Sequence, residues 1–163
     1  MITLTDLFPP DRVLQFRAAD QAAATTELVR RAAVIAGMPP GPIGAAIAAR
    51  EDLGSTGVGA GIAIPHARLD GLARMIGLFA RLERPVDWRS VDGKPVDLVF
   101  LLLSPSGSDS EHLSALALVT RRLRTPNVAA HLRATTTATE LRDALLDVPE
   151  QRPGAAYTKS LRA

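Results

Sequence analysis

A glycine-rich segment that ends in a histidine has the clearest chemical potential in this chain. Residues 54–66 read Gly-Ser-Thr-Gly-Val-Gly-Ala-Gly-Ile-Ala-Ile-Pro-His, with four glycines within eight positions. Glycine lets the backbone adopt positive φ and approach a ligand closely. The apolar triplet 62–64 predicts a short strand, and Pro65 fixes its own φ and keeps Ile64 extended. The segment therefore predicts a loop and a strand that present the His66 imidazole rigidly beside backbone N–H groups.

A neutral imidazole is a competent nucleophile near neutral pH, and phosphorus is a suitable target for it. Phosphoryl transfer needs alignment and stabilisation of the equatorial oxygens more than it needs covalent help. The N–H groups of the glycine loop at Gly57, the hydroxyls of Ser55 and Thr56, and the guanidinium of Arg50 could supply that stabilisation. The alternative is that the two hydroxyls belong to turn residues and that Arg50 is a solvated helix terminus.

The other two histidines differ in context. His112 follows Glu111 in the first turn of an expected helix, where N–H groups and the helix dipole favour an anion. It could contact a phosphate held by His66, or it could only help to cap the helix. His131 lies within a short helical pattern with no companion motif, so we expect a structural or solvent-facing residue.

The segment from Arg50 to His66 closely resembles the phosphorylation-site signature of enzyme IIA domains of the bacterial phosphoenolpyruvate-dependent phosphotransferase system. The resemblance is to the fructose/mannitol class (type 2), and the Gly-Ser-Thr-Gly form is most similar to its nitrogen-regulatory branch. It extends through 95–105, the Glu111-His112-Leu113 triplet and the Arg121-Arg122-Leu123 helix end, and covers roughly residues 5–148.

The resemblance implies specific roles for three residues. His66 would accept a phosphoryl group from a histidine-containing phosphocarrier protein, Arg50 would be the active-site arginine, and His112 the second active-site histidine. It also implies a mixed sheet flanked by helices. Three positions depart from the common family pattern: Ala60 stands where Asn is frequent, and Ala67 and Arg68 stand where Gly and Lys are common.

Composition restricts the remaining classes of function. The 163 residues include no cysteine, so disulfides, thiolate metal sites and cysteine nucleophiles are excluded. The 19 basic and 17 acidic residues give a net charge of +2, too balanced to indicate nucleic acid as a partner. No signal peptide or membrane-spanning run is visible, which predicts a cytoplasmic protein without membrane insertion. Motifs of zinc sites, serine hydrolases and P-loops are missing, so no metal or cofactor is expected.

Hydrophobic periodicity and caps predict one α/β (α+β) domain over residues 1–148, with a mixed sheet flanked by helices and a disordered tail over 149–163. The predicted strands span 12–16, 62–64, 75–82 and 96–103, with a turn region over 83–95 that contains Asp92-Gly93. The predicted helices span 20–36, 43–52, 109–124, 125–133 and a last one from a cap at 137 through Val148. Asp20 is expected to be the N-cap of the first helix, and Gly37 is expected to end it. The Pro-Pro-Gly-Pro segment at 39–42 is expected to be a break between helices. Capping boxes are expected at Ser108–Glu111 and at Thr137–Glu140. Pro126 is expected in the first turn of its helix.

The leading hypothesis is a cytoplasmic phosphocarrier of the nitrogen-regulatory type that carries a phosphoryl group on His66. Without cysteine the chain contains no IIB part, whose acceptor residue in this class is cysteine. An acceptor would then be a separate IIB protein of a sugar permease, or the chain would act on an unknown regulatory target. A binding module that signals without phosphoryl flow is a further alternative, and the joint presence of Arg50, His66 and His112 argues against it.

Overall fold

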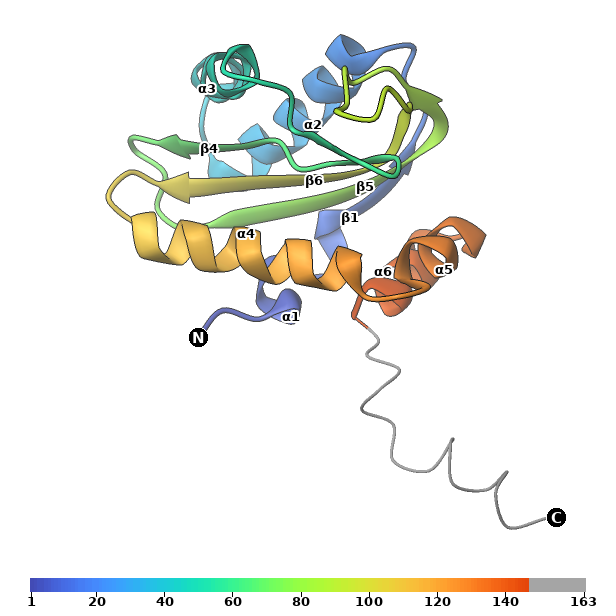
Figure 1. Cartoon of the computed structure of the whole chain (residues 1–163). Coiled ribbons are helices and arrows are strands. Elements are labelled where there is room, and N and C mark those ends of the chain that lie inside the picture. The colour runs from blue at the N-terminus through green and yellow to red at the C-terminus, as the bar shows by residue number, and fades with distance from the viewer. Residues whose placement is uncertain (147–163) are drawn as a thin grey trace, which may run out of the picture.

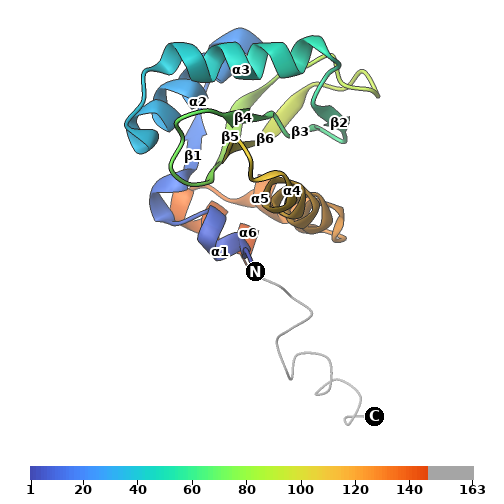
Figure 2. The same cartoon turned by 90° about the vertical axis from the view of Figure 1, so that its left-hand side faces the viewer.

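A mixed β-sheet lies at the centre of the molecule, with helices on both of its faces (Figures 1 and 2). The computed structural model describes residues 1–146; the expected inward-facing Val148 and the expected tail 149–163 lie outside the described residues. Within this range the predicted fold class, a mixed sheet flanked by helices, is confirmed.

Six strands form the sheet, in the order β1-β5-β6-β3-β2, with β4 also paired to β6. Strands β5 and β6 are the long antiparallel pair at its centre. The pairs β1–β5, β3–β6 and β4–β6 are parallel, and β2–β3 is antiparallel. The bounds are β1 (Val13–Phe16), β2 (Gly57–Gly59), β3 (Ile62–Ala63), β4 (His66–Leu69), β5 (Ile76–Val86) and β6 (Val96–Pro105).

The helices form a layer on each face of this sheet (Figure 2). Helices α2 (Gln21–Ala36) and α3 (Pro40–Asp52) cover one face. The other face carries α1 (Leu4–Leu7), α4 (Asp109–Arg124), α5 (Val128–Ala134) and α6 (Ala138–Leu146), and a 3₁₀ turn, η1 (Pro10–Arg12), leads into β1.

Side-chain alternation along β6 explains why both faces are covered. Val99, Leu101 and Leu103 belong to the core beneath α2 and α3, and Phe100 and Leu102 belong to the core beneath α4–α6. Successive strand residues point to opposite faces, so a strand that is apolar throughout must be buried on both sides. The strand predicted over 96–103 is therefore the centre of both cores.

The ends of α2 follow from its sequence. Asp20 has an extended backbone, and its carboxylate accepts a hydrogen bond from the N–H of Ala23 at 2.8 Å. Gly37 ends the helix in the left-handed conformation with φ 64°, which costs glycine little. Both predictions are confirmed.

The expected break at 39–42 is wrong, because α3 begins there. Pro40 occupies the first turn of the helix, where a missing N–H costs no hydrogen bond and the fixed φ suits the helix. The helix that carries Arg50 is therefore one turn longer than predicted.

Two caps and one helix start also differ from prediction. The hydroxyl of Ser108 makes no capping hydrogen bond, so the first capping box is wrong although α4 begins at Asp109 as expected. At α6 the Thr137 hydroxyl accepts from the N–H of Glu140 at 3.1 Å, but the Glu140 carboxylate accepts from Thr136 at 2.9 Å rather than closing the box. Helix α5 begins at Val128, because Asn127 adopts a left-handed φ of 67° and separates Pro126 from it.

The two long strands, β5 and β6, end beyond their predicted ranges, whereas β1 and β3 are each one residue shorter than predicted. Strand β5 continues through Pro85 to Val86, and the pairing shifts register between Arg81 and Val86, so the proline lies where the ladder is interrupted. The turn at Asp92-Gly93 is confirmed: Gly93 has φ 71° and its N–H donates to Ser90 at 2.9 Å. Strands β2 and β4 were not predicted.

Candidate functional site

His66 is the first residue of β4, immediately after Pro65. It pairs with Leu102 of the central strand β6, so the most buried strand of the sheet fixes its backbone. The N–H of Leu102 donates to the carbonyl of Pro65 at 3.0 Å, which anchors the proline as well. The sequence predicted that the strand before Pro65 would hold the imidazole rigidly. In the structure a second short strand after the proline, β4, also supports it.

One ring nitrogen of His66 is engaged by the backbone. Nδ1 lies 2.8 Å from the carbonyl oxygen of Ile64. A carbonyl only accepts hydrogen bonds, so Nδ1 carries the proton in the neutral ring. Nε2 is then the nitrogen with the free electron pair, and it faces α3.

Arg50 lies across from that free nitrogen. Its Nε–H donates to Nε2 of His66 at 3.2 Å, and its Nη1 donates to the carbonyl of Gly54 at 2.9 Å. The end of α3 and the start of the glycine loop therefore hold the guanidinium beside Nε2 of His66.

His112 lies on the other side of the same space, in the first turn of α4. Its ring centroid is 5.4 Å from that of His66, with the two planes tilted by 52°. Its Nδ1 lies 2.6 Å from the hydroxyl of Ser104, a fully buried residue near the end of β6. The structure thus brings together the three predicted site residues, and it adds Ser104 as the group that orients the second imidazole.

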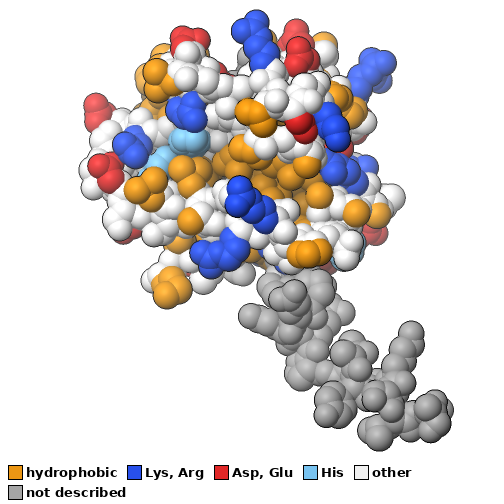
Figure 3. Space-filling model, viewed as in Figure 1, with side chains coloured by type: hydrophobic (Ala, Val, Ile, Leu, Met, Phe, Trp, Pro, Cys, Tyr) orange, Lys and Arg blue, Asp and Glu red, His pale blue; other side chains and the backbone are white. Residues whose placement is uncertain are grey.

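A cavity of about 500 Å³ opens at these side chains, between α3, β4 and α4. Figure 3 shows histidine side chains at the surface near the ends of β4 and β6, with hydrophobic and basic side chains around them. Leu53 and Leu113, which line the cavity, are 85% and 60% exposed. An apolar rim around an accessible imidazole is suited to contact with another protein.

Burial makes both imidazoles weak bases. The pKa of His66 is lowered from 6.5, chiefly because the ring is desolvated and also because Arg50 lies nearby, although the hydrogen bond to Ile64 opposes the change. The pKa of His112 is lowered by desolvation and then by His66 and Arg68. Both rings are therefore neutral at pH 7, which leaves the electron pair on Nε2 of His66 available.

The three residues predicted to bind phosphate, Ser55, Thr56 and Gly57, do not line this cavity. The hydroxyl of Ser55 donates to the carbonyl of Trp88 at 2.6 Å and accepts from the N–H of Gly57 at 3.0 Å. The N–H of Thr56 donates to the carboxylate of Glu51 at 3.2 Å, and its hydroxyl donates to the same group. Their polar groups stabilise the loop, which is the alternative left open by the sequence.

The positions that depart from the family pattern have clear surroundings. Ala60 has φ 56°, its N–H donates to Asp92 at 2.9 Å, and its carbonyl accepts from Arg133 at 2.8 Å. Ala67 and Arg68 line the cavity, and Arg68 forms an exposed ion pair with Asp109 at 3.2 Å. Arg68 therefore adds positive charge to the rim, next to His112.

Three residues near the site were missed by the sequence analysis: Glu51, Trp88 and Ser104. Their roles depend on contacts between segments far apart in the chain, such as the 3.3 Å hydrogen bond from Nε1 of Trp88 to Glu51. Glu51 directly follows Arg50, and this adjacency is the one signal that could have indicated it.

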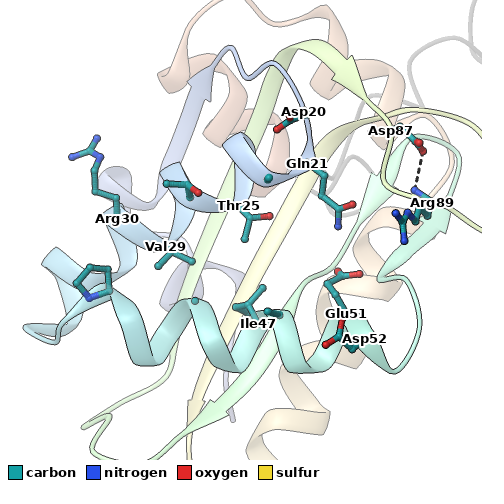
Figure 4. Close-up of a pocket in the computed structure, with 15 residues that line it drawn as sticks. Asp20, Gln21, Thr25, Val29, Arg30, Ile47, Glu51, Asp52, Asp87 and Arg89 are labelled. Carbon is teal, nitrogen blue, oxygen red and sulfur yellow. Dashed lines mark hydrogen bonds between the residues drawn. The ribbon is translucent and has the colours of Figure 1, made fainter.

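A second hollow, of about 800 Å³, lies between α2 and α3 on the other side of α3. Figure 4 shows its apolar floor with Val29 and Ile47, and its polar end with Glu51 and Asp52. It contains none of the three histidines. Helix α3 is thus the wall between this groove and the cavity at His66.

Over residues 1–146 no group of three histidine, cysteine or acidic side chains is arranged to hold a metal ion. Within the same range, every helix is too short or too polar to cross a membrane.

Known proteins resemble most of this chain. Residues 21–148 match the family model described as phosphoenolpyruvate-dependent sugar phosphotransferase system, EIIA 2. A nitrogen regulatory protein of Bradyrhizobium diazoefficiens is 46% identical over 132 residues, covering 80% of this chain and 86% of the relative. One from Escherichia coli (strain K12) is 41% identical over 111 residues, covering 68% of each chain.

Solved structures give the same result. The crystal structure of nitrogen regulatory protein IIA-Ntr from Neisseria meningitidis matches with a TM-score of 0.82 and 29% identity, covering 87% of this chain and 98% of that one. The mannitol IIA of Escherichia coli, at 22% identity and a TM-score of 0.69 over 85% of this chain and 98% of that one, shares the fold. The chain belongs to the EIIA type 2 family of the phosphoenolpyruvate-dependent sugar phosphotransferase system.

Proposed function

We propose that this protein is a phosphocarrier regulator of the nitrogen-regulatory IIA type, which accepts a phosphoryl group on Nε2 of His66. The observation that carries the proposal is the position of that nitrogen: its partner Nδ1 is bound to the Ile64 carbonyl at 2.8 Å, and Arg50 lies 3.2 Å away on the open side. The donor is a phosphohistidine on a histidine-containing phosphocarrier protein.

Transfer of the phosphoryl group to His66 requires no separate base, because no proton has to leave the attacking nitrogen. The electron pair of Nε2 forms the new N–P bond, while the N–P bond of the donor breaks and its electron pair returns to the donor imidazole. The His66 ring, which keeps its proton on Nδ1, becomes cationic. The hydrogen bond from that proton to the Ile64 carbonyl then stabilises the positive charge.

Arg50 and His112 are proposed to stabilise the transferred group. The guanidinium that now donates to Nε2 can donate to phosphoryl oxygens once Nε2 is bonded to phosphorus. His112 lies on the opposite side of the cavity, where it can donate a hydrogen bond to a second oxygen. Fixed donors aimed at developing charge are the main source of rate enhancement in phosphoryl transfer.

Similarity to nitrogen regulatory proteins favours a regulatory role over sugar uptake. The related mannitol IIA forms a complex with phosphorylated enzyme IIB, so the exposed apolar rim at His66 is proposed as the surface that meets the donor and any separate acceptor.

Incubation with phosphoenolpyruvate, enzyme I and the carrier protein tests the proposal. We expect an acid-labile, base-stable phosphate on the wild-type protein and none on His66→Ala, because the nucleophilic nitrogen is removed. His131→Ala, which changes an exposed histidine, is the matched control and should be labelled like wild type. Unlabelled wild type would contradict the proposed function, and labelled His66→Ala would contradict the choice of residue.

A further inference from the structure

The carboxylate of Glu51, at the end of α3, accepts three hydrogen bonds from the glycine loop and from Trp88. It accepts from the N–H of Thr56 at 3.2 Å, from the hydroxyl of Thr56, and from Nε1 of Trp88 at 3.3 Å. A carboxylate only accepts hydrogen bonds, so it suits three converging donors as no neutral side chain of its size can. The indole N–H also lies 3.2 Å from the Thr56 hydroxyl, and both Trp88 and Thr56 are buried, which protects this side of the cluster from solvent.

Backbone hydrogen bonds continue from this cluster to the nucleophile. The carbonyl of Thr56 accepts from the N–H of Ile64 at 3.0 Å. The carbonyl of the same Ile64 is the group that fixes the proton on Nδ1 of His66 at 2.8 Å. A single residue, Ile64, therefore connects the Glu51 cluster to the ring: its N–H bonds to the loop and its carbonyl bonds to the imidazole.

The same residue also acts on the opposite side of the ring. Glu51 directly follows Arg50, and its own carbonyl accepts from the N–H of Gly54 at 3.0 Å. Gly54 in turn holds the guanidinium of Arg50 through its carbonyl. Movement of Glu51 relative to the loop would thus displace the groups that contact both nitrogens of His66.

We propose that Glu51 is a positioning residue for phosphoryl transfer: its carboxylate, bound to Thr56 and Trp88, holds Ile64 and Arg50 so that Nε2 of His66 carries the free electron pair and faces the donor. It does not contact the phosphoryl group. The expected effect of Glu51 on the rate of phosphoryl transfer rests on the proposed function. The expected effect of Glu51 on the protonation of the His66 ring is independent of it.

Asp52 provides a matched control. It is the next residue of α3, it lines the same α2/α3 groove as Glu51, and Figure 4 shows both carboxylates at the same end of the helix. Within residues 1–146 its side chain makes no hydrogen bond or ion pair. Asp52→Asn removes the same charge from the same groove and leaves the Thr56–Trp88 cluster intact.

The test compares Glu51→Gln with Asp52→Asn and wild type. The amide of glutamine brings two N–H donors toward Thr56 and Trp88, so at least one of the three hydrogen bonds is lost. Long-range ¹H–¹⁵N spectra of the histidine rings report which nitrogen carries the proton. We expect wild type and Asp52→Asn to show His66 protonated on Nδ1, and Glu51→Gln to show a mixture of the two neutral forms.

Phosphorylation kinetics provide the second measurement. We expect Glu51→Gln to lower kcat by about 10- to 100-fold, because small misplacements of reacting atoms cost that much, with KM for the donor protein changed by less than about twofold. Asp52→Asn should match wild type in both constants. A uniform loss of stability without a change in ring protonation or kcat would overturn the proposal.

Thr56→Val keeps the test decisive if Glu51→Gln does not fold. Valine has nearly the same shape but lacks the hydroxyl that donates to Glu51, and it leaves the Thr56 carbonyl in place. It should shift the His66 ring in the same direction, by a smaller amount; an unchanged ring in a folded variant overturns the proposal. If wild type were not phosphorylated at all, the proposed function would fail while the spectra still tested the role of Glu51.

Discussion

At the scale of single residues, the two imidazoles of the site are each held through Nδ1. The Ile64 carbonyl holds Nδ1 of His66, and the Ser104 hydroxyl holds Nδ1 of His112. Nε2 of His66 in turn accepts a hydrogen bond from Nε–H of Arg50 at 3.2 Å. In both rings Nδ1 makes the contact with the sheet, which leaves Nε2 for the chemistry proposed above.

His112→Ala tests the second ring. We expect phosphorylation of His66 to slow by about 10- to 100-fold, since one donor to the phosphoryl oxygens is lost. The measurement is the initial rate of label transfer from the phosphorylated carrier, with His131→Ala as the exposed-histidine control. Equal rates in a folded His112→Ala variant would leave His112 with a purely structural role.

The sequence allowed prediction of the residues with distinctive local patterns but not of their supports. His66 follows from a glycine loop and a proline, whereas the role of Arg50 follows from the resemblance to the family signature. Ser104, Glu51 and Trp88 have no such pattern, because their partners are separated from them by up to 37 residues. The hydroxyl of Ser55, predicted to bind phosphate, likewise has a partner that the sequence does not indicate, the carbonyl of the distant Trp88.

At the scale of elements, local signals predicted the helices well and the short strands poorly. Asp20 and Gly37 mark the ends of α2 by their own backbone preferences. Pro40 was ambiguous because proline both interrupts helices and favours their first turn. Strand β4 is four residues long, and it exists only because β6 offers it a parallel partner, which periodicity alone does not show.

The glycine loop should be intolerant of side chains where it packs closely. A Cβ at Gly57 would lie 3.0 Å from the Cα of Ser90, so Gly57→Ala should lower the free energy of unfolding by about 1–3 kcal/mol. Gly44→Ala is the control, because the nearest atom to its Cβ is Val29 Cγ1 at 3.9 Å and alanine favours helices.

Urea unfolding of both variants measures these effects. We expect Gly44→Ala to gain up to about 1 kcal/mol, so the two glycines should respond with opposite signs. If Gly44→Ala lowered the free energy of unfolding and Gly57→Ala left it unchanged, the prediction would be wrong: the loop would accommodate a Cβ and α3 would not.

At the scale of the whole molecule, the site makes stability depend on pH. The pKa values of His66 and His112 are lowered from 6.5 in the folded state, so the unfolded chain binds more protons as pH falls through 6.5. Stability is therefore full above pH 6.5 and decreases below it, until the folded pKa values are reached. Some carboxylates also have a lowered pKa; that of Glu27 is about 2 instead of the ordinary 4.5. These groups decrease stability only at lower pH, when they become protonated.

Urea unfolding at pH 7.5 and pH 5.5 checks this dependence. We expect lower stability at pH 5.5, and a smaller difference in His66→Gln, which removes one of the two groups. If the loss of stability between pH 7.5 and pH 5.5 were the same in His66→Gln as in wild type, the pH dependence would come from groups other than His66.

The parallel pairing of β4 with β6 also determines when the site can first form during synthesis. His66 leaves the ribosome well before Leu102, the residue that fixes its backbone, and before His112, which completes the cavity. A nascent or truncated chain that lacks β6 and the start of α4 has the imidazole but not its orientation. The complete site therefore forms only in chains that have been translated through α4 and have closed the central sheet.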